Sequence, residues 1–210
     1  MPPNMRCFQV SAEHECYVDH TTTILGQLDV GRFSYISDHG FVFGRSKIQI
    51  GAFCSIGPYF HCVTHEQHPT VFPSTFPLAQ VIGVPLTRGD VQGLDVLGSV
   101  VDEKPVTIGN DVWIGEGVSI AGGLTIGDGC IIGAKSMVTR DCVPYGVYVG
   151  TPAKLIRMRF PELFVEQLLE IKWWEWPLAK IRASAAFFET DLCTYVGDLQ
   201  DLIRPEPIAA

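Results

Sequence analysis

Three of the chain's six histidines, His61, His65 and His68, lie within one short stretch, HCVTHEQH. A neutral imidazole can accept a proton at physiological pH, and it is also a common zinc ligand. The H-x3-H-x2-H spacing therefore leaves three interpretations open: a general base with two bystanders, a metal site, or polar residues of a solvated loop. The elements that position this stretch have to decide between them.

Composition limits the class of protein. At 210 residues the chain suits one domain with a proper core, or one domain with a small appendage. Hydrophobic residues make up 47% and charged residues 18%, which is typical of a globular protein. The first residues, MPPNMRCFQV, lack the pattern of a signal peptide, and no apolar run is long enough to cross a bilayer. We therefore expect no membrane partner.

The net charge and the cysteines limit which binding partners and which cellular location we expect. The formal net charge of −8 argues against a nucleic-acid partner, because duplex binding needs a broad basic face. The seven cysteines form no CxxC pair, which favours reduced thiols and a cytoplasmic location over a disulfide framework. An anionic small ligand would need the few basic residues to gather in one place.

A sixfold repeat runs through the second half of the chain. Aliphatic residues recur at every sixth position, namely Ile108, Ile114, Ile120, Ile126, Ile132 and Val138. Small or apolar residues stand four places after each of them, namely Val112, Val118, Leu124, Cys130, Ser136 and Cys142. Neither the helical period of 3.6 nor the strand period of 2 explains this spacing.

Six residues fit one short strand and a corner, where a glycine takes the unusual backbone angles. The repeat therefore predicts a mainly β protein, a parallel β-helix in which three strands make one triangular coil. Neighbouring coils then stack through parallel ladders at a spacing of about 4.8 Å. Residues 30–35 and 50–61 match as earlier rungs.

The repeat breaks at two places. From residue 65 to residue 104 it vanishes in a proline-rich segment, and loops of that length inside a compact domain are usually functional. After Arg157 the pattern becomes helical, with Pro161 at a first helical position and apolar residues recurring up to Pro177. We expect a β-helix domain over residues 1–160, including the excursion loop 65–104. A helical segment over 161–210 should cap an open coil end or pack on a neighbouring subunit, with the tryptophans of WWEWP in packing roles.

Several blocks together resemble the xenobiotic acetyltransferase branch of the hexapeptide acyltransferases, over about residues 28–183. They are VGRFSY, IGAFCSIGP, HPTVFPSTFP, IGNDVWIGEGVSIAGGLTIGDGCIIGAKSMVTRD, VGTPAKLIRMRF and FVEQLLEIKWWEWPLAKI. The resemblance implies a left-handed β-helix and a homotrimer with active sites between subunits. It also implies acetyl transfer from acetyl-CoA to a hydroxyl of a small acceptor, either an antibiotic or a carbohydrate.

Transfer to a hydroxyl needs a base, because a hydroxyl is a poor nucleophile. The stretch from His68 to Pro77 resembles the HPT…ST.P catalytic loop of polysaccharide-acetylating relatives, which implies that His68 is the base. His65 lies close enough to compete for this role. Direct transfer needs no acyl-enzyme, so we expect no nucleophilic cysteine.

Coenzyme A carries a pyrophosphate and a 3′-phosphate, and the basic stretch from Arg140 to Arg159 could meet them, since guanidinium groups suit phosphate. The resemblance implies that the coenzyme is bound by Trp113, Ala134, Thr139, Arg140, Gly150, Lys154 and Arg157. Packing of Trp113 against a neighbour is the equal alternative.

The resemblance further implies that Tyr35, Asp38 and His39 bind the acceptor. A donor must also meet the negative charge that develops on the thioester carbonyl. Glu116 stands where some sugar-acetylating relatives carry a serine, and a carboxylate cannot donate. A backbone N–H, for instance in residues 121–123, would then have to serve.

Two other interpretations stay open. Gamma-class carbonic anhydrases also use a left-handed β-helix with histidine ligands, so a zinc lyase is an alternative. Against it, His61 is expected on a rung and no histidine follows His68, whereas a zinc site needs three converging ligands and an open position. A β-helical scaffold subunit that has lost its site is the non-enzymatic alternative.

Overall fold

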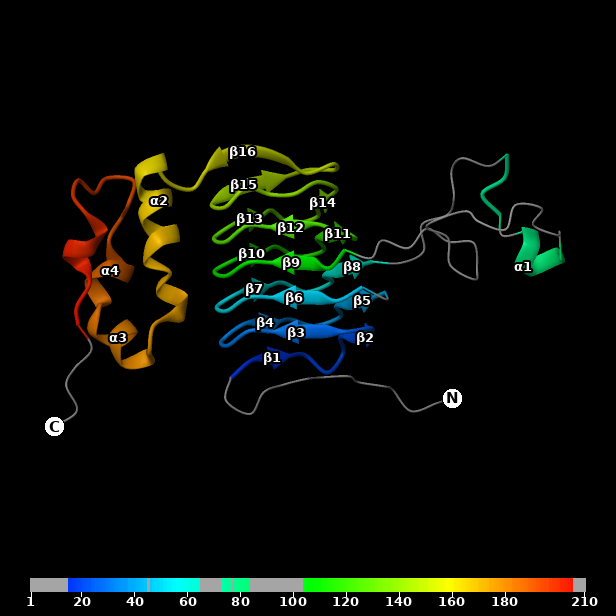
Figure 1. Cartoon of the computed structure of the whole chain (residues 1–210), viewed down its shortest axis with the longest axis horizontal. Helices are drawn as coiled ribbons and strands as arrows, with labels where there is room; N and C mark the ends of the chain where they lie inside the picture. Colours follow the sequence, from blue (N-terminus) through cyan, green and yellow to red (C-terminus); the bar gives the residue numbers. More distant parts are fainter. Residues whose placement is uncertain (1–14, 45, 65–72, 77, 84–103, 206–210) are drawn as a thin grey trace.

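The computed structural model describes residues 15–44, 46–64, 73–76, 78–83 and 104–205, and its strands form the three faces of a prism (Figure 1). Face 1 contains β1 Tyr17–Val18, β4 Tyr35–Ile36, β7 Ser55–Ile56, β10 Trp113–Ile114, β13 Ile131–Ile132, β15 Gly146–Val149 and β16 Lys154–Met158. Face 2 contains β2 Thr23–Leu25, β5 Phe41–Phe43, β8 His61–Val63, β11 Ser119–Ala121 and β14 Met137–Val138. Face 3 contains β3 Leu28–Val30, β6 Ile48–Ile50, β9 Val106–Ile108 and β12 Thr125–Ile126.

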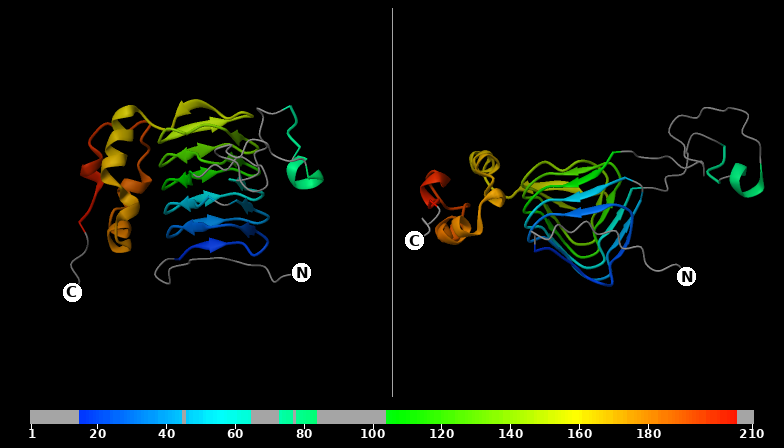
Figure 2. Two further views of the ribbon diagram at one scale, coloured as in Figure 1. Left: turned by 45° about the vertical axis from the view of Figure 1, so that its right-hand side comes forward. Right: turned by 60° about the horizontal axis from the view of Figure 1, so that its bottom comes forward.

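The chain visits faces 1, 2 and 3 in turn and then begins the next coil, as the triangular outline in the right-hand view of Figure 2 shows. Neighbouring strands within a face pair in parallel, except that β16 runs antiparallel to β15 at the C-terminal end of face 1. We call the turn between faces 1 and 2 the first corner, that between faces 2 and 3 the second corner, and that between faces 3 and 1 the third corner.

The interior of the prism confirms the sixfold repeat. The six aliphatic residues at sixfold spacing are all at most 2% exposed, and of the residues four places after each, only Leu124 is half-buried rather than buried. Cys54, Cys62, Cys130 and Cys142 also point into the core. A parallel β-helix of hexapeptide repeats is therefore the fold of residues 15–158, interrupted between β8 and β9.

We predict that Ile114→Ala lowers the free energy of unfolding by about 2–5 kcal/mol, because Ile114 is fully buried between two neighbouring coils and the truncation leaves a cavity. Thr125→Ala, on the exposed side of face 3, should cost no more than about 0.5 kcal/mol. Both values would come from denaturant unfolding at one fixed protein concentration. Equal small losses in the two variants would contradict close packing of the prism.

The C-terminal helical segment lies along the side of the prism (Figures 1 and 2). Its elements are α2 Glu162–Ile171, η1 Trp173–Glu175, α3 Leu178–Ala183, α4 Ala185–Glu189 and η2 Leu199–Leu202. It does not cap an open coil end, contrary to one of the two expectations. The short helix α1 Leu78–Ile82 stands on the opposite side of the prism.

The predicted helix up to Pro177 is shorter in the structure. It ends at Ile171 because Lys172 adopts left-handed backbone angles (φ 45°, ψ 53°) and donates its N–H to the carbonyl of Leu168. Trp174 and Trp176 are buried, so the packing role expected for these tryptophans is confirmed. A second hydrophobic cluster, which includes Tyr145 and Phe164, holds this segment together. The domain boundary at residue 160 remains a prediction.

Two arginines tie the helical segment to the third corner. The guanidinium of Arg32 donates to the carbonyls of Trp174 and Trp176, at 2.7 and 2.5 Å. Arg159 donates to the Asp111 carboxylate at 3.0 Å and to the carbonyl of Gly129 at 2.7 Å. Burial raises the pKa of Asp111 in spite of this pairing with Arg159. The third corner is therefore covered within the chain itself.

Candidate active site

The histidine stretch begins on the outer side of face 2. His61 lies on β8, exposed, between Phe41 of β5 and Ser119 of β11, and its ring meets that of Phe41 edge-on at 6.0 Å. His65 and His68 fall outside the described residues. Thr64, the last described residue before the gap, lies at the second corner, and the next strand of the coil is β9 on face 3. The predicted catalytic loop therefore starts from the second corner.

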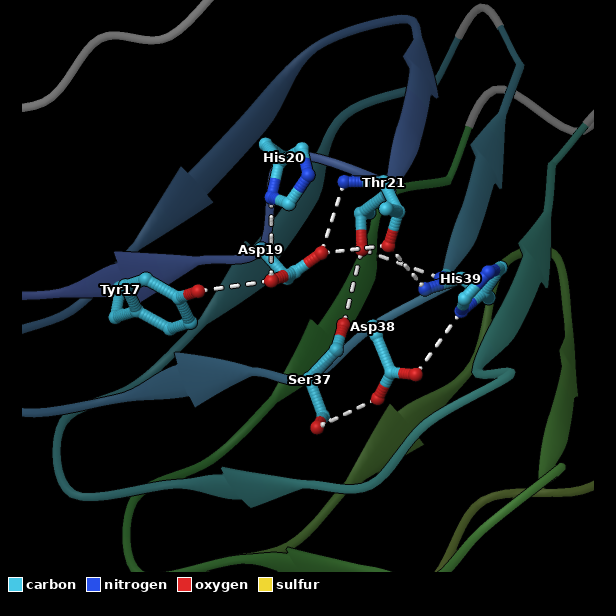
Figure 3. A network of polar contacts seen from close by, with 9 residues as sticks. Tyr17, Asp19, His20, Thr21, Ser37, Asp38 and His39 are labelled. Atoms are coloured by element: carbon cyan, nitrogen blue, oxygen red, sulfur yellow. Dashed lines mark hydrogen bonds and ion pairs between the residues drawn. The ribbon is translucent and has the colours of Figure 1, made fainter.

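The predicted acceptor residues Asp38 and His39 lie at the first corner (Figure 3). Nδ1 of His39 is 2.9 Å from the Asp38 carboxylate, and the His39 N–H donates to Oγ1 of Thr21 in the coil below. The hydrogen bond from His39 is the main reason that the pKa of Asp38 is lowered. Asp38 is thus an ionised acceptor that orients the imidazole of His39.

A second carboxylate anchors this corner from the first coil (Figure 3). Asp19 accepts hydrogen bonds from the N–H and the hydroxyl of Thr21 and from the hydroxyl of Tyr17, at 2.8, 2.5 and 2.8 Å. Together these hydrogen bonds lower the pKa of Asp19, and the bond from the Thr21 hydroxyl makes the largest contribution. Because Thr21 also receives the His39 N–H, the network fixes the backbone that carries His39.

The first corner continues upward through the coils as a column of side chains. The rings of His39 and Tyr59 stack, with centroids 5.2 Å apart. The ammonium of Lys135 lies 5.9 Å from the Tyr59 ring centroid and 2.6 Å from the Glu116 carboxylate. Both Tyr59 and Lys135 are well exposed, and together they form a surface that faces away from the prism.

Three of the predicted coenzyme residues join the top of this column. Ala134 lies exposed at the first corner, directly before Lys135. Gly150 follows β15 and donates its N–H to the Ser136 hydroxyl at 3.0 Å, so it rests on the same corner. Lys154 begins β16 opposite Val149, and its side chain is exposed. These three residues therefore form one group.

The remaining predicted residues lie elsewhere. Thr139 and Arg140 are exposed at the second corner, at the opposite end of β14 from Ala134. Tyr35 and Trp113 stand exposed on the outer side of face 1. Arg157 lies on β16 opposite Val147 and so sits toward the third corner, away from Lys154.

The basic side chains between Arg140 and Arg159 do not lie together in one cluster. Arg159 is engaged by Asp111 at the third corner, and Arg140 lies at the second corner. Only Lys154 joins the first corner. Within a single chain, most of the predicted coenzyme residues are thus divided between the two ends of face 2, with Ala134, Gly150 and Lys154 at the first corner and Thr139 and Arg140 at the second.

Known proteins place the chain in a family. The bacterial transferase hexapeptide pattern, of six repeats, matches residues 105–140. A chloramphenicol acetyltransferase of Agrobacterium fabrum is 38% identical over 172 residues, which cover 75% of this chain and 79% of that protein. The chain belongs to the xenobiotic acetyltransferase branch of the hexapeptide acyltransferases.

Two further proteins agree with this assignment. A probable macrolide acetyltransferase of Lysinibacillus sphaericus is 32% identical to this acetyltransferase over 172 residues, which cover 80% of the chain and 88% of that protein. The crystal structure of a hexapeptide-repeat acetyltransferase from Vibrio cholerae shares the fold, with a TM-score of 0.54 at 24% identity over 70% of this chain and 73% of the other. A structure of that Vibrio protein holds acetyl coenzyme A. The present acetyltransferase is an acyltransferase that uses acetyl-CoA as its co-substrate.

The buried cysteines of the acetyltransferase are poor nucleophiles. Burial raises the pKa of Cys54 to about 11 and that of Cys62 to about 12, because the thiolate would lose its hydration. Each of the two side chains belongs to the hydrophobic core of the prism. Their packing agrees with direct transfer and gives these thiols no part in an acyl-enzyme.

The zinc interpretation receives no support from the described part of the acetyltransferase. His61 points outward from face 2, and within the described residues no three His, Cys, Asp or Glu side chains gather to hold a metal. Likewise, no described helix is both long and apolar enough to cross a bilayer.

Sequence reasoning missed Tyr59 and Lys135. The signal was present in the repeat, because His39, Tyr59 and Lys135 each stand three places after a buried isoleucine of face 1. In a hexapeptide helix, residues at the same position of every third repeat stack above one another. Extending the register from His39 would have identified the column.

Proposed function

We propose that the protein is an O-acetyltransferase that transfers acetyl from acetyl-CoA to a hydroxyl of an antibiotic or a sugar, at sites between the subunits of a homotrimer. The observation that carries this proposal is the division of most of the predicted coenzyme residues between the first and the second corner. One prism offers two half-sites at the two ends of face 2. A complete site then needs two chains.

Face 2 is the surface best suited to the trimer. Its outer side carries many apolar side chains, which are Leu25, Phe41, Phe43, Val63, Ala121 and Met137. The outer side of face 3 is polar, with Asp29, Gln49, Thr107 and Thr125. Burial of apolar surface drives association, and the helical segment already covers the third corner.

Closed threefold symmetry joins the two half-sites. If face 2 of each prism turns toward the axis, the first corner of one chain meets the second corner of the next. The seam then brings Ala134, Gly150 and Lys154 of one chain beside Thr139 and Arg140 of its neighbour. Coenzyme A would lie in this seam, with its phosphates near the basic side chains.

The catalytic loop also starts from the second corner, so it would reach into the same seam. His68, with His65 as the competing candidate, takes the proton of the acceptor hydroxyl while the oxygen attacks the thioester carbonyl carbon. Collapse of the tetrahedral intermediate breaks the C–S bond, and the imidazolium returns the proton to the coenzyme thiolate. Holding both substrates in one seam supplies the proximity that direct transfer requires.

The acceptor would lie against the first corner and face 1, where Asp38 and His39 offer polar groups and Tyr35 and Trp113 offer flat apolar surface. Chloramphenicol is the first acceptor to test, because several relatives at 34–38% identity are chloramphenicol acetyltransferases. We place the protein in the cytoplasm, where acetyl-CoA is supplied.

The test is a measurement of coenzyme A thiol release with acetyl-CoA and a panel of acceptors, comprising chloramphenicol, a macrolide, maltose and a galactoside. We expect acceptor-dependent release with at least one hydroxylated compound and a mass gain of one acetyl group on its hydroxyl. Thiol release that no acceptor accelerates would contradict O-acetylation of these classes.

A further inference from the structure

The side chain of Lys135 is held in a defined place on the first corner. Its backbone N–H donates to the carbonyl of Glu116 at 2.8 Å, and its ammonium donates to the Glu116 carboxylate at 2.6 Å. The two side chains are 66% and 51% exposed, so they face the space outside the prism. An ammonium has three donors, and this ion pair uses one of them.

Gly117 makes this placement possible. A Cβ at Gly117 would lie 2.8 Å from Cδ and from Nζ of Lys135, so any other residue would displace the lysine. Gly117 also has φ 65°, an angle that favours glycine. Lys135 therefore lies across the coil below and reaches the ring of Tyr59, which the stacked His39 supports from beneath.

Attack on a thioester puts negative charge on the carbonyl oxygen, and a prearranged donor there gives a large part of the catalysis. The Glu116 carboxylate can only accept hydrogen bonds, whereas the Lys135 ammonium is a charged donor. In the proposed seam, Lys135 directly follows Ala134 in the chain, and its ammonium lies over Gly117 beside Glu116, on the exposed surface of the first corner.

We propose that Lys135 is a catalytic residue whose ammonium donates to the oxyanion that forms on the thioester carbonyl. This inference rests on the proposed function. As the acceptor oxygen bonds to the carbonyl carbon, the π electrons move to the carbonyl oxygen and meet the ammonium. When the C–S bond breaks, the carbonyl reforms and the ammonium keeps its protons. Glu116, Gly117 and Tyr59 are positioning residues that hold Lys135 in place.

The test compares Lys135→Gln with Lys135→Arg in the full-length protein. We expect Lys135→Gln to lower kcat on the order of a hundredfold, with the Kd of acetyl-CoA nearly unchanged in calorimetry. Lys135→Arg keeps the charge and should recover part of the loss. The matched control is Lys180→Gln on α3, because the Lys180 ammonium also lies over an aromatic ring, 4.2 Å from the centroid of Trp176. Its kcat should equal that of the wild type.

Acetyl-CoA hydrolysis without any acceptor passes through the same oxyanion, so it should show the same loss in Lys135→Gln. The hydrolysis measurement tests the role of Lys135 separately from the proposed O-acetylation, because it does not depend on finding the acceptor. Unchanged kcat for transfer and for hydrolysis in Lys135→Gln would overturn the role of Lys135. A fall in kcat/KM that is matched by weaker acetyl-CoA binding at constant kcat would overturn it too, and would make Lys135 a coenzyme-binding residue only.

Discussion

Replacement of His68 by alanine is expected to lower kcat about 10²- to 10⁴-fold, because the acceptor hydroxyl then loses its general base. Acetyl-CoA binding and the proposed trimer should persist, since the residues proposed to bind the coenzyme and the outer side of face 2 remain. Thiol release measures the turnover, calorimetry the coenzyme affinity, and light scattering the mass of the assembly.

Two further variants make this result specific. His20→Gln, on an exposed side chain of the first coil, should keep wild-type turnover. His65→Ala decides between the two loop histidines, because the base is the one whose loss removes turnover. Full turnover in both His68→Ala and His65→Ala would contradict a histidine base.

Val63→Arg is expected to convert the proposed trimer to monomers and to abolish turnover. Val63 lies half-buried on the outer side of β8, between Phe43 and Ala121. In the proposed trimer this substitution places one charge per chain on the face nearest the axis, and an unpaired buried charge costs several kcal/mol. Loss of assembly separates the two half-sites, so activity should fall together with mass.

The matched control introduces the same charge on another face. Gln49 lies on the outer side of β6, among the polar side chains of face 3. Gln49→Arg should keep the trimer and full activity. A trimeric, active Val63→Arg variant would show that face 2 does not form the interface.

The β-helix was predictable because its repeat is local. Ile108, Ile114 and Ile120 are six residues apart and each is buried. The spacing in the chain therefore gives the length of one strand and its corner directly. The path of the helical segment was not predictable in this way. Lys172 ends α2 through a left-handed angle, and Arg32 binds the carbonyls of Trp174 and Trp176 from more than a hundred positions away.

The sequence predicts a set of site residues but not how they are arranged. The family motifs pointed to Ala134 and Arg140, which stand only six positions apart, yet the structure puts them at opposite ends of β14. A hexapeptide carries the chain from one corner to the next, so residues six apart belong to different corners. Motifs spanning two corners would therefore mix residues from two different sites of the proposed trimer.

Complementation between two inactive variants tests directly whether each active site is shared by two chains. His68→Ala removes the proposed base, and Ala134→Trp places a bulky ring at the first corner. Each variant alone should be inactive. In co-expressed mixed trimers, one seam in three combines an intact first corner with an intact loop.

With random assembly about three quarters of the trimers are mixed, so we expect about a quarter of the wild-type kcat for the co-expressed sample. The measurement is thiol release by the purified mixture, compared with the two parent variants at equal total concentration. A rate near one quarter supports sites built from two chains. Activity no higher than that of the parents, in trimers shown by mass spectrometry to contain both chains, would contradict it.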